Sequence, residues 1–185
     1  MNRQEKIKTS FFIRGFTQSA LFTIISRLSG FVRDIFIAAF LGAGIVSDIF
    51  LIAFKLPNLF RKITAEGALT SAFLPIYSNL KIKKGNYFAS IYFKKILLRV
   101  AVFLFLLMII FQIIMPIIIY FLAPGFINNE EVINEITTLS RITIIFMPLI
   151  SIVALLGVAT NVSGKFWVLA FTPTILNISI IFGCF

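Results

Sequence analysis

The stretch VAVFLFLLMIIFQIIMPIIIYFLA, residues 100–123, decides the fold class of this chain. It carries no charged side chain from its first residue to its last. A run of about 20 apolar residues is long enough to cross the ~30 Å hydrocarbon core of a bilayer as a helix. Residues 142–164 and 166–185 are also uncharged. These three stretches predict membrane-spanning helices.

The composition supports the same class for the whole chain. Of 185 residues, 59% are hydrophobic and 13% are charged, and the mean hydropathy is +1.04. Soluble domains have roughly 45–50% apolar and about 25% charged residues, because they need a polar surface around the core. We therefore predict an all-α, polytopic membrane helix bundle with about five transmembrane helices, since one crossing with its loop takes roughly 30 to 40 residues.

Turn residues divide the chain into expected helices. The segments LGAG (41–44), KKGN (83–86), APGFINN (123–129) and SGK (163–165) hold the Gly, Pro and Asn residues that end helices. The helices are predicted near 11–41, 45–80, 87–121, 131–161 and 166–185. Pro57 is expected to interrupt the second helix, because proline has no N–H for the helical ladder.

The residue inventory excludes several kinds of chemistry. The chain has no histidine and a single cysteine, Cys184, which excludes a histidine-containing zinc site, a disulfide framework and a Ser-His triad. No nucleotide-binding P-loop motif is present. The net charge of +10 comes from basic residues that flank apolar segments, so nucleic acid is not an expected partner. We expect neither an enzyme nor a cofactor or metal.

The basic residues of the connections predict the orientation. The N-terminal tail, the second-to-third connection with its flank, and the fourth-to-fifth connection hold Arg3, Lys6, Lys8, Lys81, Lys83, Lys84, Lys94, Lys95 and Lys165. The other two connections, 41–47 and 122–135, hold no Lys or Arg, and the second of them is acidic. The positive-inside rule therefore places the N-terminus in the cytoplasm.

The first two helices differ from the others in carrying charges at or near membrane depth. These charged residues are Arg27, Arg33, Asp34, Asp48, Lys55, Arg61, Lys62 and Glu66. A charge at the bilayer centre costs from about 2.5 to more than 10 kcal/mol, so such residues usually face a partner or a watery cavity. At 100° per residue, the first helix gathers Ser19, Thr23, Ser26, Arg27, Gly30, Arg33 and Asp34 in one arc of about 120°. The second helix gathers Asp48, Lys55, Asn58, Lys62 and Glu66 in another arc.

Two polar stripes on consecutive helices predict one shared cavity. An excess of fixed positive charge there would attract an anion, and the planar fork of arginine suits phosphate oxygens. Alternatives stay open for single residues: Arg27 could pair with Asp34 one heptad on, and Lys62 could extend to the head groups. Glu66 could serve as a salt-bridge partner. The residues alone favour a transporter half-site for a phosphorylated, lipid-linked substrate.

Two long motifs cover the first helices: SRLSGFVRDIFIAAFLGAG (26–44) and SDIFLIAFKLPNLFRKITAEGALTSAFLPIYSN (47–79). They resemble the MurJ (MviN) family of lipid II flippases, in the multidrug/oligosaccharidyl-lipid/polysaccharide exporter superfamily. LAPGF (122–126) and FTPTILNIS (171–179) match further family blocks in the expected order. The family's fold has two lobes around a central cavity. The resemblance implies that residues 1–185 are a truncated, partial N-terminal lobe without the C-terminal lobe.

The resemblance also implies roles for residues of this chain. Arg27, Arg33 and Arg61 match cavity arginines that would bind the pyrophosphate of undecaprenyl-linked lipid II, while Ser26, Asp34, Asp48, Lys55 and Glu66 match cavity or gate positions. Flipping would proceed by alternating access in the bacterial inner membrane, with membrane lipids and other cell-wall synthesis proteins as partners. The competing interpretation is a membrane-embedded scaffold whose charges only pair helices.

Overall fold

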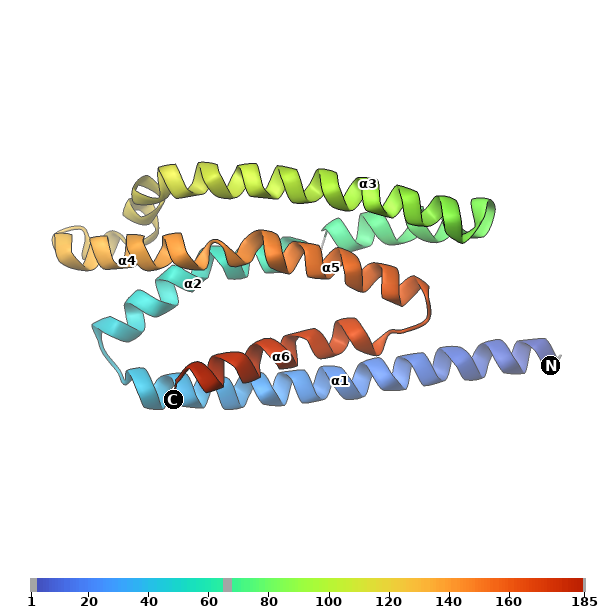
Figure 1. The fold of residues 1–185 in the computed structure, drawn as a ribbon. Helices are drawn as coiled ribbons and strands as arrows, with labels where there is room; N and C mark the ends of the chain where they lie inside the picture. The colour runs from blue at the N-terminus through green and yellow to red at the C-terminus, as the bar shows by residue number, and fades with distance from the viewer. Residues whose placement is uncertain (1–2, 65–67, 185) are drawn as a thin grey trace. The chain divides into compact units, whose positions relative to one another are not determined.

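The computed structural model describes residues 3–64 and 68–184, with side chains in 17–63 and 71–184. The chain order is α1 (Arg3–Leu41), α2 (Ile45–Thr64), α3 (Ala68–Leu122), the short 3-10 helix η1 (Pro124–Phe126), α4 (Glu130–Thr143), α5 (Phe146–Val162) and α6 (Trp167–Gly183) (Figure 1). No strand occurs within these described ranges. The predicted all-α class is confirmed.

Long apolar surfaces on the helices agree with a membrane environment. In the described part of the chain, Ser71–Leu122 and Glu130–Val162 are long and apolar enough to cross a bilayer, and Trp167–Gly183 is a shorter apolar helix. Large side chains of α3 point outward, with Ile113 72% and Phe121 80% exposed. Lipid tails tolerate such a surface, whereas a soluble monomer rarely exposes large contiguous apolar patches.

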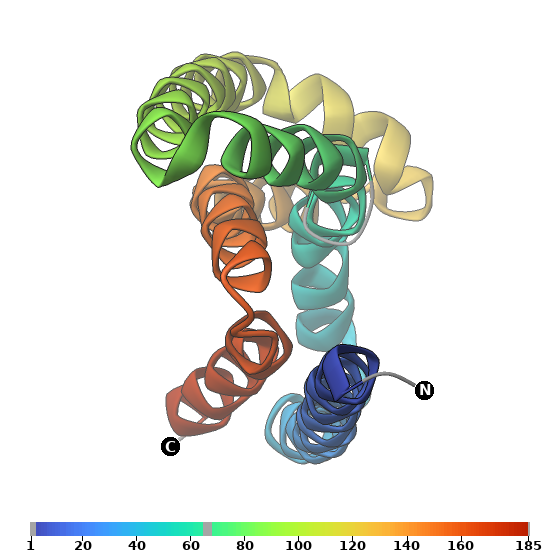
Figure 2. The same ribbon diagram turned by 90° about the vertical axis from the view of Figure 1, so that its right-hand side faces the viewer.

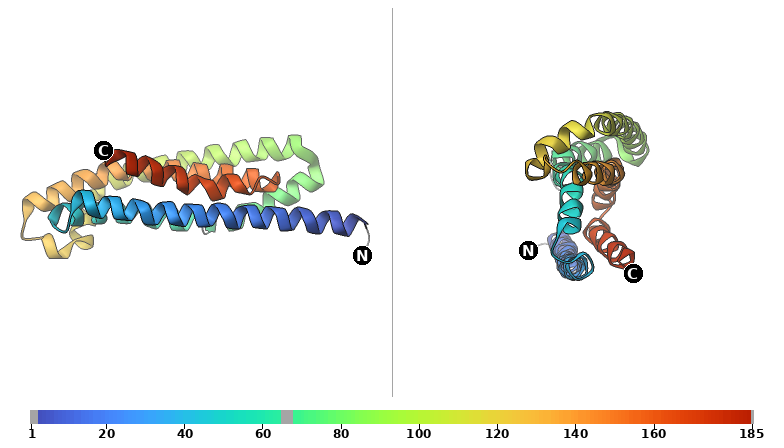
Figure 3. Two further views of the ribbon diagram at one scale, coloured as in Figure 1. Left: turned by 90° about the horizontal axis from the view of Figure 1, so that it is seen from below. Right: turned by 90° about the vertical axis from the view of Figure 1, so that its left-hand side faces the viewer.

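Two compact units make up the chain. The first unit contains Met1–Gly42 and Gly157–Phe185, and in it α6 lies alongside α1 (Figure 3). Phe22 of α1 packs its ring against Trp167 and Phe171, with ring centroids 6.0 and 5.5 Å apart. These aromatic contacts help to hold α1 and α6 together.

The second unit, Ala43–Leu156, has its own apolar core. Helix α4 packs against both α2 and α3. The core residues are Ile49, Leu104, Met115, Ile119, Ala123, Val132, Ile136, Ile144 and Met147. Asn129 caps the start of α4, because its side-chain oxygen accepts from the Val132 N–H at 3.2 Å.

Helix α3 is a hairpin of two helical arms. Gly85 has φ 81° and ψ 173° and interrupts the helical backbone, and glycine adopts positive φ without a steric penalty. Figure 2 shows this turn end-on. The chain reversal predicted at 83–86 is therefore present, and the second arm ends at Leu122, close to the expected end at 121.

Two expected helices are divided differently in the structure. The range 45–80 falls in α2 and in the first arm of α3, and the range 131–161 falls in α4 and α5. Pro148 explains the second division, because it offers no N–H to the Ile144 carbonyl. That carbonyl instead accepts from the Met147 N–H at 3.0 Å, across three residues. The tighter bond separates α4 from α5.

Pro57 does not end α2, contrary to the expected interruption, and Pro116 likewise lies inside α3. Each proline leaves the carbonyl four residues earlier without a helical donor. Thr143 Oγ1 donates to the Ala53 carbonyl at 2.8 Å. Arg141 Nε donates to the Gln112 carbonyl at 3.2 Å, and Gln112 Nε2 donates to the Arg141 carbonyl at 2.7 Å. The last turn of α4 thus replaces both lost backbone hydrogen bonds, as side chains of neighbouring helices do in membrane proteins.

Candidate functional site

A polar network joins α1 to α6 in the first unit. Its centre is Asn177, which is only 5% exposed. The Asn177 Nδ2 group donates to the Ser26 carbonyl at 3.1 Å and to Ser29 Oγ at 2.9 Å. Its Oδ1 atom accepts from Arg33 Nη1 at 2.9 Å. One amide side chain on α6 therefore contacts three successive turns of α1.

Gly30 also lies beside Asn177 at this interface. A Cβ atom at Gly30 would lie 3.4 Å from Asn177 Nδ2, at the lower edge of ordinary van der Waals contact. Small residues at helix interfaces let backbones approach closely in membranes. Ser26, Ser29 and Gly30 together form the surface of α1 that receives Asn177.

Arg33 also pairs with the residue that follows it. Its Nη2 and Nε atoms donate to Asp34 Oδ1 at 2.7 and 3.0 Å. The Arg33 side chain is 29% exposed and that of Asp34 is 64% exposed, so solvent or a ligand reaches the pair and the pair alone contributes little stability. A guanidinium has five N–H donors, of which three are used in these contacts. Arg33 is therefore oriented and still has donors for an anion.

Arg27 has a different environment from Arg33. Its side chain is exposed, and among the described residues the carboxylate of Asp34 pairs with Arg33. The alternative in which Arg27 pairs with Asp34 is therefore wrong. The reason is the geometry of α1, because Arg33 is adjacent to Asp34 whereas Arg27 lies about two turns away. Arg27 is available to a ligand.

The second set of predicted residues lies on α2. The side chains of Asp48, Lys55, Asn58 and Lys62 are exposed, and that of Arg61 is half-buried. Ile49, Ala53 and Pro57 are buried on the other side of α2. Asp48 lies in the first turn and Arg61 in the last turn, which complements the helix dipole. Glu66 lies outside the described residues.

The two polar stripes belong to different units. Ser26, Arg27, Arg33 and Asp34 lie in the first unit, whereas Asp48, Lys55 and Arg61 lie in the second. The cavity that the two stripes would share stays a prediction. In the described part of the chain no group of three or more His, Cys, Asp or Glu residues could hold a metal ion.

Asn177 and Ser29 were not among the residues predicted from the sequence. The available signal was weak: Asn177 is a strongly polar residue in an otherwise apolar, uncharged helix. Such residues often bond to a neighbouring helix, but neither the partner helix nor the register follows from that pattern. Thr174, one turn earlier on α6, is also buried, and its Oγ1 has no hydrogen-bond partner in the described residues.

Comparison with known proteins assigns the chain to a transporter family. Residues 37–185 match the family model described as "Lipid II flippase MurJ". The chain is 41% identical over 165 residues to a protein of Rickettsia prowazekii named "Probable lipid II flippase MurJ", covering 88% of this chain and 32% of that protein. Proteins of the same name from Buchnera aphidicola (Acyrthosiphon pisum) and Rhizobium meliloti are 40% and 34% identical, over 88% and 86% of the chain and 32% and 30% of their own lengths. The chain thus spans about a third of the length of these relatives.

Proposed function

The chain belongs to the MurJ family, and from this premise we propose that it forms part of a flippase that moves lipid II across the bacterial inner membrane. The observation that carries the proposal is the family match over residues 37–185. The relatives' name states the substrate, and the apolar helices suit a multi-pass membrane protein. The activity is transport, in which a lipid changes leaflets and no covalent bond is made or broken.

In this proposal Arg27, Arg33 and Arg61 bind the pyrophosphate of the lipid. Exposed Arg27 and the remaining donors of Arg33 support the assignment, because arginine binds phosphate oxygens through paired hydrogen bonds. Arg61 lies within the segment that matches the family model, whereas Arg27 and Arg33 precede it. The proposed cavity and gate residues are Ser26, Asp34, Asp48, Lys55 and Glu66.

The Asp34 contact gives Arg33 a resting position. An exposed ion pair is worth only about 0–1 kcal/mol, so a pyrophosphate carrying several charges could displace Asp34 from the guanidinium. The Asn177 contact would keep Arg33 oriented during this exchange. Alternating access then needs an energy source, and one charge moved through 100 mV supplies about 2.3 kcal/mol.

The proposed orientation puts the N-terminus in the cytoplasm. The α3 turn, with Lys83 and Lys84, then lies on the cytoplasmic side, and the loop that contains η1 lies in the periplasm. Lipid II and bilayer lipids are the proposed partners. Contacts with other cell-wall synthesis proteins stay a prediction.

A scaffold function is the second candidate, because the Asn177 network joins α1 to α6 with Arg33 as a member. In that case Arg33 needs only its contacts with Asp34 and Asn177. The scaffold hypothesis predicts that loss of the Asn177 side chain impairs function as much as loss of the Arg33 side chain. It also predicts that Arg27 is dispensable.

The test uses an intact flippase that carries the matching substitutions. Arg27→Lys, Arg33→Lys and Arg61→Lys keep the charge but remove the planar fork, so each should fail to support growth after the native flippase is depleted. Arg99→Lys, at an exposed position on α3, is the matched control and should support growth. Full growth with all three site variants would reject pyrophosphate recognition by these arginines.

A further inference from the structure

An aromatic cluster joins the two arms of α3 near their turn. This cluster consists of Phe73 and Tyr77 on the first arm and Tyr92 and Phe93 on the second arm. The rings of Phe73 and Tyr92 are nearly parallel, 2° apart in plane and 6.4 Å between centroids. The ring centroids of Tyr77 and Phe93 lie 5.6 Å apart. Phe73 and Tyr77 are buried, so the cluster packs the first arm against the second.

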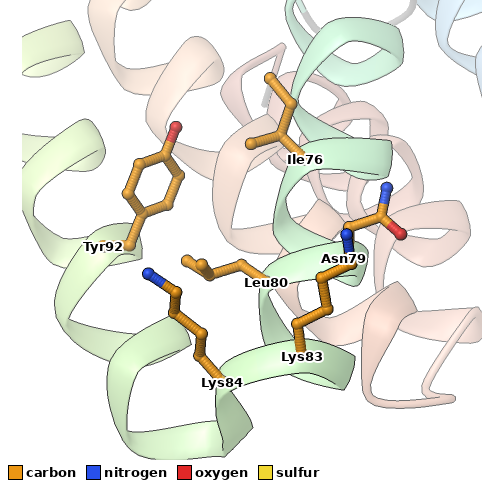
Figure 4. Close-up of a pocket in the computed structure, with 6 residues that line it drawn as sticks. All are labelled: Ile76, Asn79, Leu80, Lys83, Lys84 and Tyr92. Carbon is orange, nitrogen blue, oxygen red and sulfur yellow. The ribbon is translucent and has the colours of Figure 1, made fainter.

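A pocket of about 360 Å³ lies beside this cluster. Its lining is Ile76, Asn79, Leu80, Lys83, Lys84 and Tyr92. Figure 4 shows the Lys84 ammonium group extending toward the Tyr92 ring and the Lys83 ammonium group toward Asn79. Two cations, an amide and a phenol therefore surround one space.

No carboxylate neutralises the pocket lysines from their own segment. The sequence from 67 to 129 contains no Asp or Glu, and the pocket lining contains none. The described residues show an ion pair for Arg33 and Asp34 but none for Lys83 or Lys84. The pocket therefore has an uncompensated charge that favours an anion.

The surface around the pocket is apolar as well as basic. Three large side chains within a few residues of the lysines are exposed: Ile82 by 79%, Tyr87 by 72% and Phe88 by 58%. A site for a soluble anion does not need exposed apolar side chains, whereas a lipid presents a charged phosphate and hydrocarbon together. Tyrosine and lysine near helix ends are typical of the membrane interface.

We propose that this pocket binds the phosphate head group of an anionic phospholipid of the bilayer. Lys83 and Lys84 contact the phosphate oxygens, and the Asn79 amide and the Tyr92 hydroxyl donate hydrogen bonds to the head group. Ile82 and Phe88 contact the acyl chains. Basic pockets between membrane helices bind such head groups in general. The pocket lining contains none of the proposed pyrophosphate arginines, and the binding does not depend on flipping activity.

The test measures lipid binding by the purified full chain in detergent, using native mass spectrometry. Phosphatidylglycerol and phosphatidylcholine are titrated separately, so that the head-group charge is compared on similar acyl chains. The test variant is the double substitution Lys83→Gln and Lys84→Gln. The matched control is Lys94→Gln and Lys95→Gln, which removes the same charge from exposed positions outside the pocket lining. Circular dichroism checks that both variants keep their helix content.

We expect the pocket variant to bind phosphatidylglycerol about 25-fold more weakly, at roughly fivefold per lysine. The control should lose less than about threefold, and phosphatidylcholine binding should change in neither variant. An equal loss in both variants would overturn the proposal in favour of diffuse attraction to the basic surface. Displacement of phosphatidylglycerol by equimolar inorganic phosphate would overturn the lipid assignment. An unchanged affinity in the pocket variant would also overturn it.

Discussion

Thr143 donates its hydroxyl to the Ala53 carbonyl at 2.8 Å, and this carbonyl is the one that Pro57 leaves without a helical donor. Ala53 and Pro57 are fully buried, and Thr143 is 8% exposed. A buried carbonyl without a donor costs about 1–3 kcal/mol. The contact therefore lets α2 continue through a proline while fixing the end of α4 against it.

Thr143→Val should destabilise the chain by about 1–3 kcal/mol, because it removes the hydroxyl and keeps the shape. Thr143→Ser retains the donor and is the control. Adding Pro57→Ala should recover part of the loss, because an alanine in place of the proline supplies the missing N–H. The measurement is a double-mutant cycle on unfolding in detergent. Equal costs of Thr143→Val with and without Pro57→Ala would contradict the pairing.

Asn177→Ala should weaken the interaction between α1 and α6 by about 1–2 kcal/mol, because three hydrogen bonds between the helices disappear. Ser179→Ala on the same helix is the control, since its hydroxyl donates to the Ile175 carbonyl within α6. Limited proteolysis in detergent reports the release of α6. Similar cleavage rates in the two variants would argue against Asn177 as the link.

Gly157→Ala should strain the contact between Gly157 of α5 and α6. A Cβ atom at this position would lie 2.3 Å from Leu169 Cδ1 and 3.1 Å from its Cγ, and overpacking of this kind costs typically about 1–3 kcal/mol. The second substitution Leu169→Ala should reduce that cost by removing the clashing atoms. Thermal unfolding of the single and double variants in detergent measures the effect. No relief in the double variant would show that the strain arises elsewhere.

Cysteine labelling tests the orientation. In a Cys184→Ser background, Asn128→Cys in the exposed loop before α4 should react with a membrane-impermeant maleimide in cells with an intact inner membrane. Lys83→Cys at the α3 turn should react only after the inner membrane is permeabilised, because basic loops lie in the cytoplasm. The reverse pattern would overturn the positive-inside assignment.

The sequence by itself determined the class of protein and much of the local structure. Long uncharged runs predicted an all-α membrane bundle, since a bilayer demands apolar helices of sufficient length. The segment KKGN located the reversal at Gly85, because only glycine adopts that backbone conformation without strain. The angular positions of Asp48 and Lys55 also identified the exposed polar stripe of α2, opposite buried Ile49 and Ala53.

Tertiary structure alone decided which helices contact each other and which polar groups pair. Asn177 and Arg33 are 144 positions apart, and Thr143 and Ala53 are 90 apart, so no local pattern joins them. Local spacing allowed Arg27 to pair with Asp34, whereas the folded chain pairs Asp34 with Arg33 and holds Arg33 against α6. Periodicity specifies one face of one helix. The partner of that face depends on packing and on which buried polar groups remain without a hydrogen-bond partner.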